Sequence, residues 1–412
     1  MPSLELSRRG LIAAAGASAI TTAVPLGAVA NSVAPRAIGR DERLARLARL
    51  QARLKEGGLG ALVVEPGASL DYFTGVQWGR SERPTLAVIP ASGPLMVVTP
   101  FFERPSVAES FQVPADIRVW QEDESPYALV AEFLKQRAPN ARTIAAEETV
   151  RTFIVTGVGS AMPGVRVEDG AALVRGLRMI KSAAELALMQ RANDITLAAL
   201  RRTHAEVRAG ETNRDIGNRF ERIVTELGGS DPWSLVLIDE ASALPHGTGR
   251  PQQVKSGSVV LMDCGCAVHG YQADISRTFV WGARPTPEQR KVWEQVRQGQ
   301  EIAFAAAKVG ATAGSVDDAV RGQYERWGYG PRYALPGLSH RTGHGIGMEG
   351  HEPINLVRGE ATRLAPGMCF SNEPGIYLPG KFGVRLEDCF YMTAAGPVWF
   401  TRPPDSIDRP FG

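Results

Sequence analysis

The spacing of apolar residues along the chain predicts helices alternating with short strands. Leucines recur at helical spacing from Leu44 to Leu54, and Gly57 and Gly58 follow them, so a helix is expected between Asp41 and Gly57. Short apolar runs then predict β-strands separated by helical or turn-rich pieces. These runs are residues 61–64, 86–90, 95–99, 117–120 and 143–146. We therefore expect an α/β domain over residues 40–175.

The second half of the chain shows repeated helix-start signals. Ser182 with Glu185 three residues later is a capping box, and the helical pattern that follows runs to about Arg208. Comparable starts stand at Thr212, Thr286 and Ser315. Hairpin-like pairs of strands separate these helices. We expect a second domain over residues 178–412.

Two acidic residues lie in apolar strands on either side of one turn. Asp263 belongs to the run 259–265 and Asp274 to the run 271–279. A turn centred on Val268 and His269 would place the two carboxylates directly opposite each other, with Cβ atoms about 5 Å apart. Like charges at that distance destabilise a sheet unless a cation lies between them.

A second pair of acidic residues has the same symmetry. Glu373 and Glu387 are equally far from Gly380, which lies in a turn-rich segment. The sequence therefore predicts a second hairpin with opposed carboxylates. Four carboxylates in apolar strands would be costly to bury without cations.

A glycine-rich run adds three histidines, His340, His344 and His351. Glycine lets a ligand approach the backbone closely and disfavours an ordinary core helix. Two divalent ions would balance the four carboxylates, with His344 as a neutral ligand. The oxygen-rich set favours manganese, with cobalt, iron or zinc as alternatives. Two such ions would make a water acidic and polarise a carbonyl, so hydrolysis is the expected chemistry.

Composition narrows the class of protein without naming a partner. The 412 residues are 44% apolar and 22% charged, which is typical of a globular chain of two or three domains. The net charge of +2 provides no field that would gather nucleic acid, so no nucleic-acid partner is expected.

The first thirty residues are typical of an export signal. Arg8 and Arg9 precede a weakly apolar stretch rich in alanine and glycine that ends at Ala30. This resembles a twin-arginine signal peptide over residues 1–30 with a small-residue cleavage site. A membrane anchor or a disordered tail is the alternative, but a membrane span needs about 20 strongly apolar residues. We expect a periplasmic protein without a stable membrane anchor.

The acidic and histidine residues together resemble a known family. The set Asp263, Asp274, His344, Glu373 and Glu387, with His246 seventeen residues before the first, is similar to the pita-bread metallopeptidases, in the branch of aminopeptidase P and prolidase. The resemblance implies an α/β (α+β type) fold, with an amino-terminal creatinase-like domain and a carboxy-terminal curved antiparallel sheet covered by helices. It also implies that Asp263 binds one metal, that Asp274 and Glu387 bridge both, and that His344 and Glu373 complete the other.

The same resemblance assigns further site residues. His246, His340 and His351 match histidines that line the substrate cleft and help to bind the scissile carbonyl. Arg385 matches an arginine near the site, where it either contacts substrate or forms a salt bridge with a ligand carboxylate. Glu373 is also the candidate proton shuttle.

The implied activity is hydrolysis of an amino-terminal Xaa-Pro bond. Two alternatives stay open: the same site acting on a small amide or betaine-type molecule, and a binding protein without catalysis. Peptide or dipeptide substrates and a homodimer are expected.

Overall fold

The computed structural model describes residues 35–411 of the chain. The predicted signal peptide, residues 1–30, lies outside the described residues. Among the helices of residues 35–411, none has the length and apolarity of a membrane span.

The amino-terminal domain is built on a six-stranded sheet of strand order β4-β3-β2-β1-β5-β6. The five predicted strands are confirmed, and β6 is an additional strand at the edge. The strands are β1 (Ala61–Val64), β2 (Leu86–Pro90), β3 (Leu95–Pro100), β4 (Ala115–Trp120), β5 (Thr143–Ala146) and β6 (Arg166–Asp169). The pairs β1–β2 and β2–β3 are antiparallel, whereas the outer pairs are parallel.

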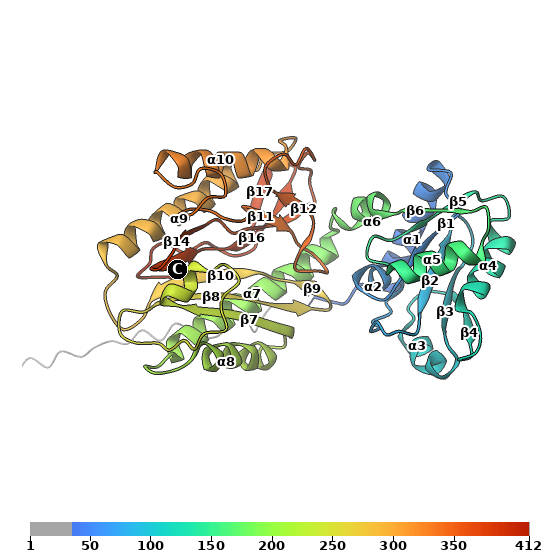
Figure 1. Cartoon of the computed structure of the whole chain (residues 1–412), viewed down its shortest axis with the longest axis horizontal. Coiled ribbons are helices and arrows are strands. Elements are labelled where there is room, and N and C mark those ends of the chain that lie inside the picture. The colour runs from blue at the N-terminus through green and yellow to red at the C-terminus, as the bar shows by residue number, and fades with distance from the viewer. Residues whose placement is uncertain (1–34, 412) are drawn as a thin grey trace, which may run out of the picture. The chain divides into compact units, whose positions relative to one another are not determined.

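Helices cover both faces of this sheet (Figure 1). Successive side chains of a strand point to opposite faces, so Leu62 packs in one core with the predicted first helix and Val63 in another with α4 and α5. The helices are α1 (Arg40–Glu56), α2 (Ala68–Thr74), α3 (Arg104–Ser110), α4 (Pro126–Arg137), α5 (Thr152–Ala161) and α6 (Ala171–Arg178), with a 3₁₀ turn, η1, at Phe101–Glu103. Both faces of β1 are therefore apolar, as its sequence requires.

The carboxy-terminal domain contains four long helices within the described residues. They are α7 (Ala183–Glu206), α8 (Asn213–Glu226), α9 (Pro287–Ala306) and α10 (Ala313–Arg326). The capping boxes expected at Ser182, Thr212 and Thr286 are present. The predicted start of the last helix was wrong: Thr312 is its N-cap. Ser315 lies within the first turn, where its hydroxyl donates to the Thr312 carbonyl.

The strands of this domain are paired in antiparallel fashion and form separate sheets. One is four-stranded, with order β10-β8-β7 and β9 paired to β8; another is five-stranded, with order β12-β11-β13-β16-β17; β14 and β15 form a two-stranded ladder. The strands are β7 (Ser230–Ile238), β8 (Val259–Val268), β9 (Tyr271–Gln272), β10 (Ile275–Val280), β11 (Gly343–Gly345), β12 (Glu352–Leu356), β13 (Cys369–Asn372), β14 (Gly375–Leu378), β15 (Phe382–Arg385), β16 (Asp388–Thr393) and β17 (Gly396–Trp399), and a 3₁₀ turn, η2, spans Asp239–Ala243.

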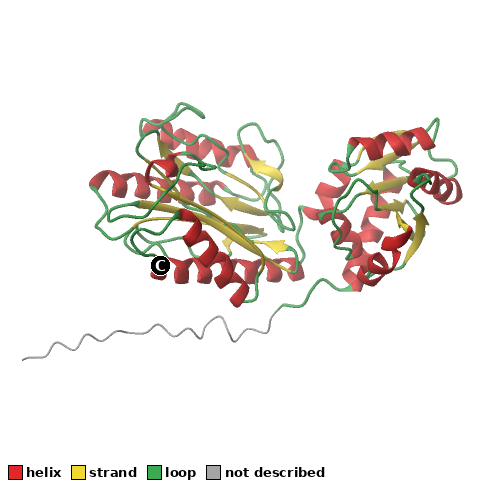
Figure 2. Ribbon diagram, turned by 60° about the horizontal axis from the view of Figure 1, so that its bottom comes forward, coloured by secondary structure: helices red, strands yellow, loops and turns green. Residues whose placement is uncertain are grey.

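Helices pack on the outside of these sheets, with the strands between them (Figures 1 and 2). One core joins α7 and α8 to β7, β8 and β10 through residues such as Leu188, Phe220 and Met262. Another joins α9 and α10 to the five-stranded sheet through residues such as Trp293 and Phe370. The inner faces of the sheets are left for the site.

The register of the first hairpin differs from the prediction. Ser276, not Asp274, lies opposite Asp263. The turn consists of His269 and Gly270, with φ angles of 48° and 84°. Two left-handed residues form the tight turn that suits a hairpin, and it lies one residue later than expected. Asp274 therefore falls between β9 and β10, diagonal to Asp263 rather than opposite it.

The register of the second hairpin is the predicted one. Gly375 pairs with Arg385 in the β14–β15 ladder, and Asn372 pairs with Asp388 where β13 meets β16. Glu373 and Glu387 occupy the interval between these two ladders. Their backbone N–H groups instead donate to Thr342 O and Ser276 O, on neighbouring segments.

Candidate metal centre and active-site cavity

The five predicted metal ligands are brought together from both sheets of the carboxy-terminal domain. Asp263 lies on β8, and Asp274 immediately precedes β10. His344 lies on β11, Glu373 follows β13, and Glu387 precedes β16. The candidate centre therefore lies on the seam between the four-stranded and five-stranded sheets.

The donor atoms form overlapping groups. Asp263, Asp274 and Glu387 each offer an oxygen within 4.8 Å of the others. His344, Glu373 and Glu387 form a similar group, so that Glu387 belongs to both. A further group joins Asp274 and His344 to His351. Two cations that share a carboxylate fit this arrangement.

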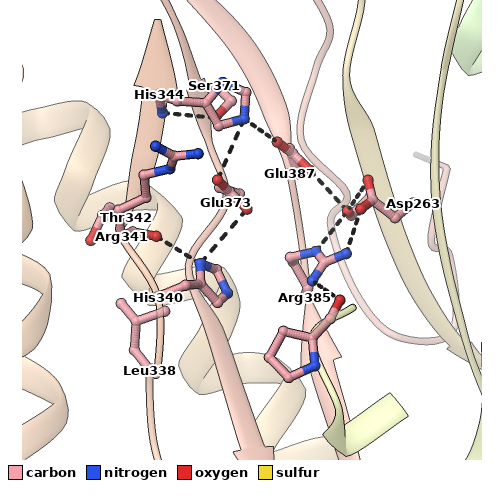
Figure 3. Close-up of polar contacts among 12 residues, drawn as sticks. Asp263, Leu338, His340, Arg341, Thr342, His344, Ser371, Glu373, Arg385 and Glu387 are labelled. Carbon is pink, nitrogen blue, oxygen red and sulfur yellow. Dashed lines mark hydrogen bonds and ion pairs between the residues drawn. The ribbon is translucent and has the colours of Figure 1, made fainter. Parts of the chain in front are cut away.

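The ring of His344 is oriented as a ligand (Figure 3). Its Nδ1 lies 3.1 Å from Gly345 O, and because a carbonyl can only accept, Nδ1 carries the proton. Nε2 is then a lone pair, yet it faces oxygens of Glu373, Asp274 and Glu387 at 3.5, 3.7 and 3.9 Å. A lone pair gains nothing from facing carboxylates unless a cation lies between them.

Two buried carboxylate oxygens also indicate that cations bind here. Among the described residues, Asp274 Oδ1 and Glu387 Oε1 are buried without a hydrogen-bond partner. Burial and, after it, the neighbouring carboxylates raise the pKa of both groups. Burial also raises the pKa of Glu373 to about 7. Divalent cations would satisfy these atoms, so the residues fit a binuclear metal centre.

Arg385 is held against the centre by several bonds. It is buried, forms an ion pair with Asp263 Oδ2, and donates from Nε to Ser276 Oγ at 3.1 Å. Ser276 Oγ lies 2.9 Å from oxygens of both Asp263 and Glu387. Of the two roles considered for Arg385, the geometry favours the salt bridge to a ligand carboxylate.

His340 has protein partners at both ring nitrogens. Nδ1 donates to Arg341 O at 2.8 Å, so Nε2 accepts from the Tyr377 hydroxyl at 2.7 Å. Arg385 Nη1 in turn donates to that hydroxyl at 3.1 Å. Burial lowers the pKa of His340 to about 3. His340 is therefore a neutral, oriented ring with no nitrogen left for substrate.

His351 has the opposite arrangement. Arg341 Nη2 lies 3.0 Å from His351 Nδ1, and because a guanidinium can only donate, that nitrogen accepts. The proton of the neutral ring is then on Nε2, which has no protein partner among residues 35–411. Burial and, after it, Arg341 lower the pKa of His351, which favours this neutral form. His351 can therefore donate a hydrogen bond to a ligand.

A cavity of about 420 Å³ opens beside these groups, a size suited to a small ligand. Its lining consists of Trp233, Leu235, Pro245, His246, Asp263, Asp274, His340, Arg341, His344, His351, Glu373, Arg385 and Glu387. Every predicted site residue is among them. His246 follows η2 and is exposed to the cavity.

Several residues of this site were not predicted from the sequence. Arg341 and Tyr377 stand inside motifs that were recognised, but a side chain between two histidines or at the end of a strand carries no signal of its own. Ser276 was not predicted because the expected register placed Asp274, and not Ser276, opposite Asp263. Trp233 and Leu235 were not predicted, because apolar residues in a strand carry no signal that marks a site.

Paired carboxylates, an imidazole lone pair and a donor histidine around one cavity define a metal-dependent hydrolase. The chain belongs to metallopeptidase family M24, whose profile matches residues 187–394. The creatinase/prolidase N-terminal domain matches residues 46–180. The implied fold, a creatinase-like domain followed by a pita-bread domain, is thereby confirmed.

The chain is also similar to individual proteins over most of their length. The chain is 31% identical to an Xaa-Pro dipeptidase of Lactobacillus delbrueckii subsp. lactis over 361 residues, which cover 86% of this chain and 96% of that one. The structure of dipeptidase PepE from Mycobacterium ulcerans matches with a TM-score of 0.81 at 31% identity, covering 90% of this chain and 98% of the other. A prolidase from Thermococcus sibiricus matches with a TM-score of 0.80 at 29% identity, covering 87% and 97%.

Proposed function

We propose that this chain is a two-metal peptidase that hydrolyses the Xaa-Pro bond of dipeptides. The observation that carries the proposal is the His344 lone pair facing three carboxylates in a cavity of dipeptide size. Similarity to proteins named Xaa-Pro dipeptidase and prolidase supports the substrate class. It favours this activity over the small amide or betaine-type substrate, and the complete ligand set favours it over a non-catalytic binding protein.

Asp263, Asp274, His344, Glu373 and Glu387 would hold the metal ions. Divalent ions in such a site supply Lewis-acid polarisation of a carbonyl and acidify water. Glu373 lies at the edge of this group, where its carboxylate can accept a proton from the attacking water and pass it to the proline nitrogen. His351 Nε2–H, or His246 in its place, donates to the carbonyl oxygen as negative charge develops there.

Arg341 supports a preference for dipeptides over longer peptides. It lines the cavity, and among residues 35–411 no carboxylate lies within ion-pair distance of its guanidinium. Its hydrogen bonds go to neutral groups, the Asn355 amide oxygen at 2.8 Å and the His351 ring. A cation with spare donors suits the free carboxylate that a dipeptide carries next to its scissile bond.

Replacing Arg341 by Met is expected to reduce kcat/KM for an Xaa-Pro dipeptide roughly ten- to hundredfold more than for the corresponding Xaa-Pro-amide, the size of a lost charge-assisted hydrogen bond. Disturbance of His351 would slow both substrates alike, so the ratio isolates the carboxylate contact. Arg358→Met, a half-exposed arginine outside the cavity, is the control. An unchanged ratio in Arg341→Met would assign the carboxylate to another group.

We further propose manganese as the native metal, because four of the five ligands are carboxylates. Metal analysis of protein purified without added metal tests this, and a different dominant metal would replace it. We also propose a homodimer, for which light scattering during size-exclusion chromatography is the test. A monomeric mass would exclude it.

Export through the twin-arginine route is proposed from residues 1–30. Residues 1–35 fused to a folded reporter are expected to deliver it to the periplasm, and Arg8→Lys with Arg9→Lys is expected to stop delivery. This route would suit a metal-dependent enzyme, because a protein that folds before transport can acquire its metal first. Delivery that survives both substitutions would indicate another route.

A further inference from the structure

Helix α10 carries a buried ion pair that faces the segment 338–342. Arg321 Nε donates to Asp317 Oδ2 at 2.7 Å, and the two side chains are 4% and 0% exposed. They are four residues apart, so they lie on one face of the helix. No atom of this pair belongs to the proposed metal centre or lines the cavity.

The remaining donors of Arg321 end on backbone carbonyls. Nη1 donates to Leu338 O and to Arg332 O, both at 2.8 Å, and Nη2 donates to His340 O. The planar guanidinium holds all three carbonyls and the carboxylate in one geometry, which a single ammonium group cannot reproduce.

Asp317 fixes the other end of the same segment. Its Oδ1 accepts from Thr342 N at 3.1 Å and from Thr342 Oγ1 at 2.7 Å. Its Oδ2 also accepts from Arg358 N at 3.0 Å. The ion pair therefore holds the backbone at both ends of residues 340–342.

On the side away from α10, each of residues 340–342 contacts a residue of the candidate active site. The ring of His340 is bonded to Tyr377, and the guanidinium of Arg341 is bonded to His351. The carbonyl of Thr342 accepts from Glu373 N at 2.9 Å. Through these contacts, the position of α10 affects where His351, Arg341 and the candidate metal ligand Glu373 lie.

We propose that Asp317 and Arg321 are positioning residues for the peptidase site, acting through segment 338–342. This inference rests on the proposed function, because it takes Arg341 as the carboxylate anchor and His351 as the oxyanion donor. Both side chains depend on where the backbone of residues 340–342 lies.

The test uses the full-length, metal-loaded enzyme with Arg321→Lys. This substitution keeps the positive charge next to Asp317 but removes the planar guanidinium that binds the three carbonyls. We expect kcat/KM for an Xaa-Pro dipeptide to fall about tenfold or more, since small displacements of catalytic groups cost up to about a hundredfold. The preference for dipeptide over its amide should fall as well, while metal content stays near the wild-type level, because Asp317 still holds Thr342 next to Glu373.

The matched control is Arg219→Lys. Arg219 forms a half-buried ion pair with Glu211 in the same domain, and neither residue lines the cavity. This variant should keep both the rate and the substrate preference. A second variant, Asp317→Asn, should reproduce the loss of preference if Arg321→Lys does not fold.

An activity-independent readout is the ¹⁵N spectrum of the histidine side chains. The signals of His340, whose two ring nitrogens are both hydrogen-bonded, should shift in Arg321→Lys and not in Arg219→Lys.

Wild-type preference and unmoved His340 signals in a folded Arg321→Lys protein would overturn the inference, whatever its melting temperature. Failure of the proposed function is distinct, because the wild-type enzyme would then not cleave Xaa-Pro dipeptides at all, and the His340 spectrum would still test the positioning.

Discussion

Glu387→Gln is expected to abolish hydrolysis, with a loss in kcat well beyond the about 10- to 100-fold expected for a group that only orients a metal ligand, and to remove metal from the protein at the same time. Glu387 belongs to both acidic donor groups, and one of its oxygens is buried without a partner in the described part of the chain. The amide has nearly the same volume but no charge, so the change removes ligand strength rather than packing. Metal analysis should find about two ions per wild-type chain and clearly fewer in the variant.

Arg385→Ala is the comparison for this variant. Arg385 supports Asp263 without offering a ligand atom, so its loss should cost about 10- to 100-fold in activity or metal affinity, as for other groups that orient metal ligands. An effect of Arg385→Ala as large as that of Glu387→Gln would contradict the bridging role. So would full activity of Glu387→Gln in metal-free buffer.

His351→Ala is expected to lower kcat by about 10²- to 10³-fold, the size expected for one lost oxyanion donor, with metal content nearly unchanged. The reason is the proton on Nε2: Arg341 occupies Nδ1 and leaves the other nitrogen as a free donor. Steady-state kinetics and metal analysis on the same preparation provide the measurement. His344→Ala should instead lose metal and activity together.

The structure makes this comparison necessary, because a further cluster joins His351 to Asp274 and His344. If His351→Ala loses as much metal as His344→Ala, His351 is a ligand. Near-normal kcat with full metal content would show that His351 takes no part in the reaction, and His246 would then be the candidate oxyanion donor.

The sequence predicted the chemistry of the site better than its geometry. Charge balance and residue type were sufficient to identify Asp263 and Glu387 as candidate ligands, and the symmetry around Gly380 predicted the register of the second hairpin. The first hairpin failed because its turn depends on a left-handed His269, a residue without a strong turn signal. One residue in the turn moves every pairing that follows it.

The roles of the histidines could not be read from their spacing. His340 and His351 lie in one glycine-rich run, yet one has both nitrogens bonded and the other has a free donor. That difference arises from Tyr377 and Arg341, which reach the rings only after the strands have paired. The free donor of His351 therefore follows from a contact with Arg341 that the spacing of the histidines does not reveal.

The position of the centre on a seam between two sheets affects stability as well as catalysis. Behind it, a fully buried ion pair between Arg277 of β10 and Asp388 of β16 already connects the sheets. Metal ions held by Asp263 and Asp274 on one side and by His344 and Glu373 on the other would form a second, removable connection between the sheets. Metal occupancy would then raise the unfolding temperature, because each occupied site would add about 2.7 kcal/mol to the free energy of unfolding at a hundredfold excess of metal over its dissociation constant. A chelator would therefore lower the unfolding temperature of the domain, so its heat resistance would depend on how well the surroundings supply metal.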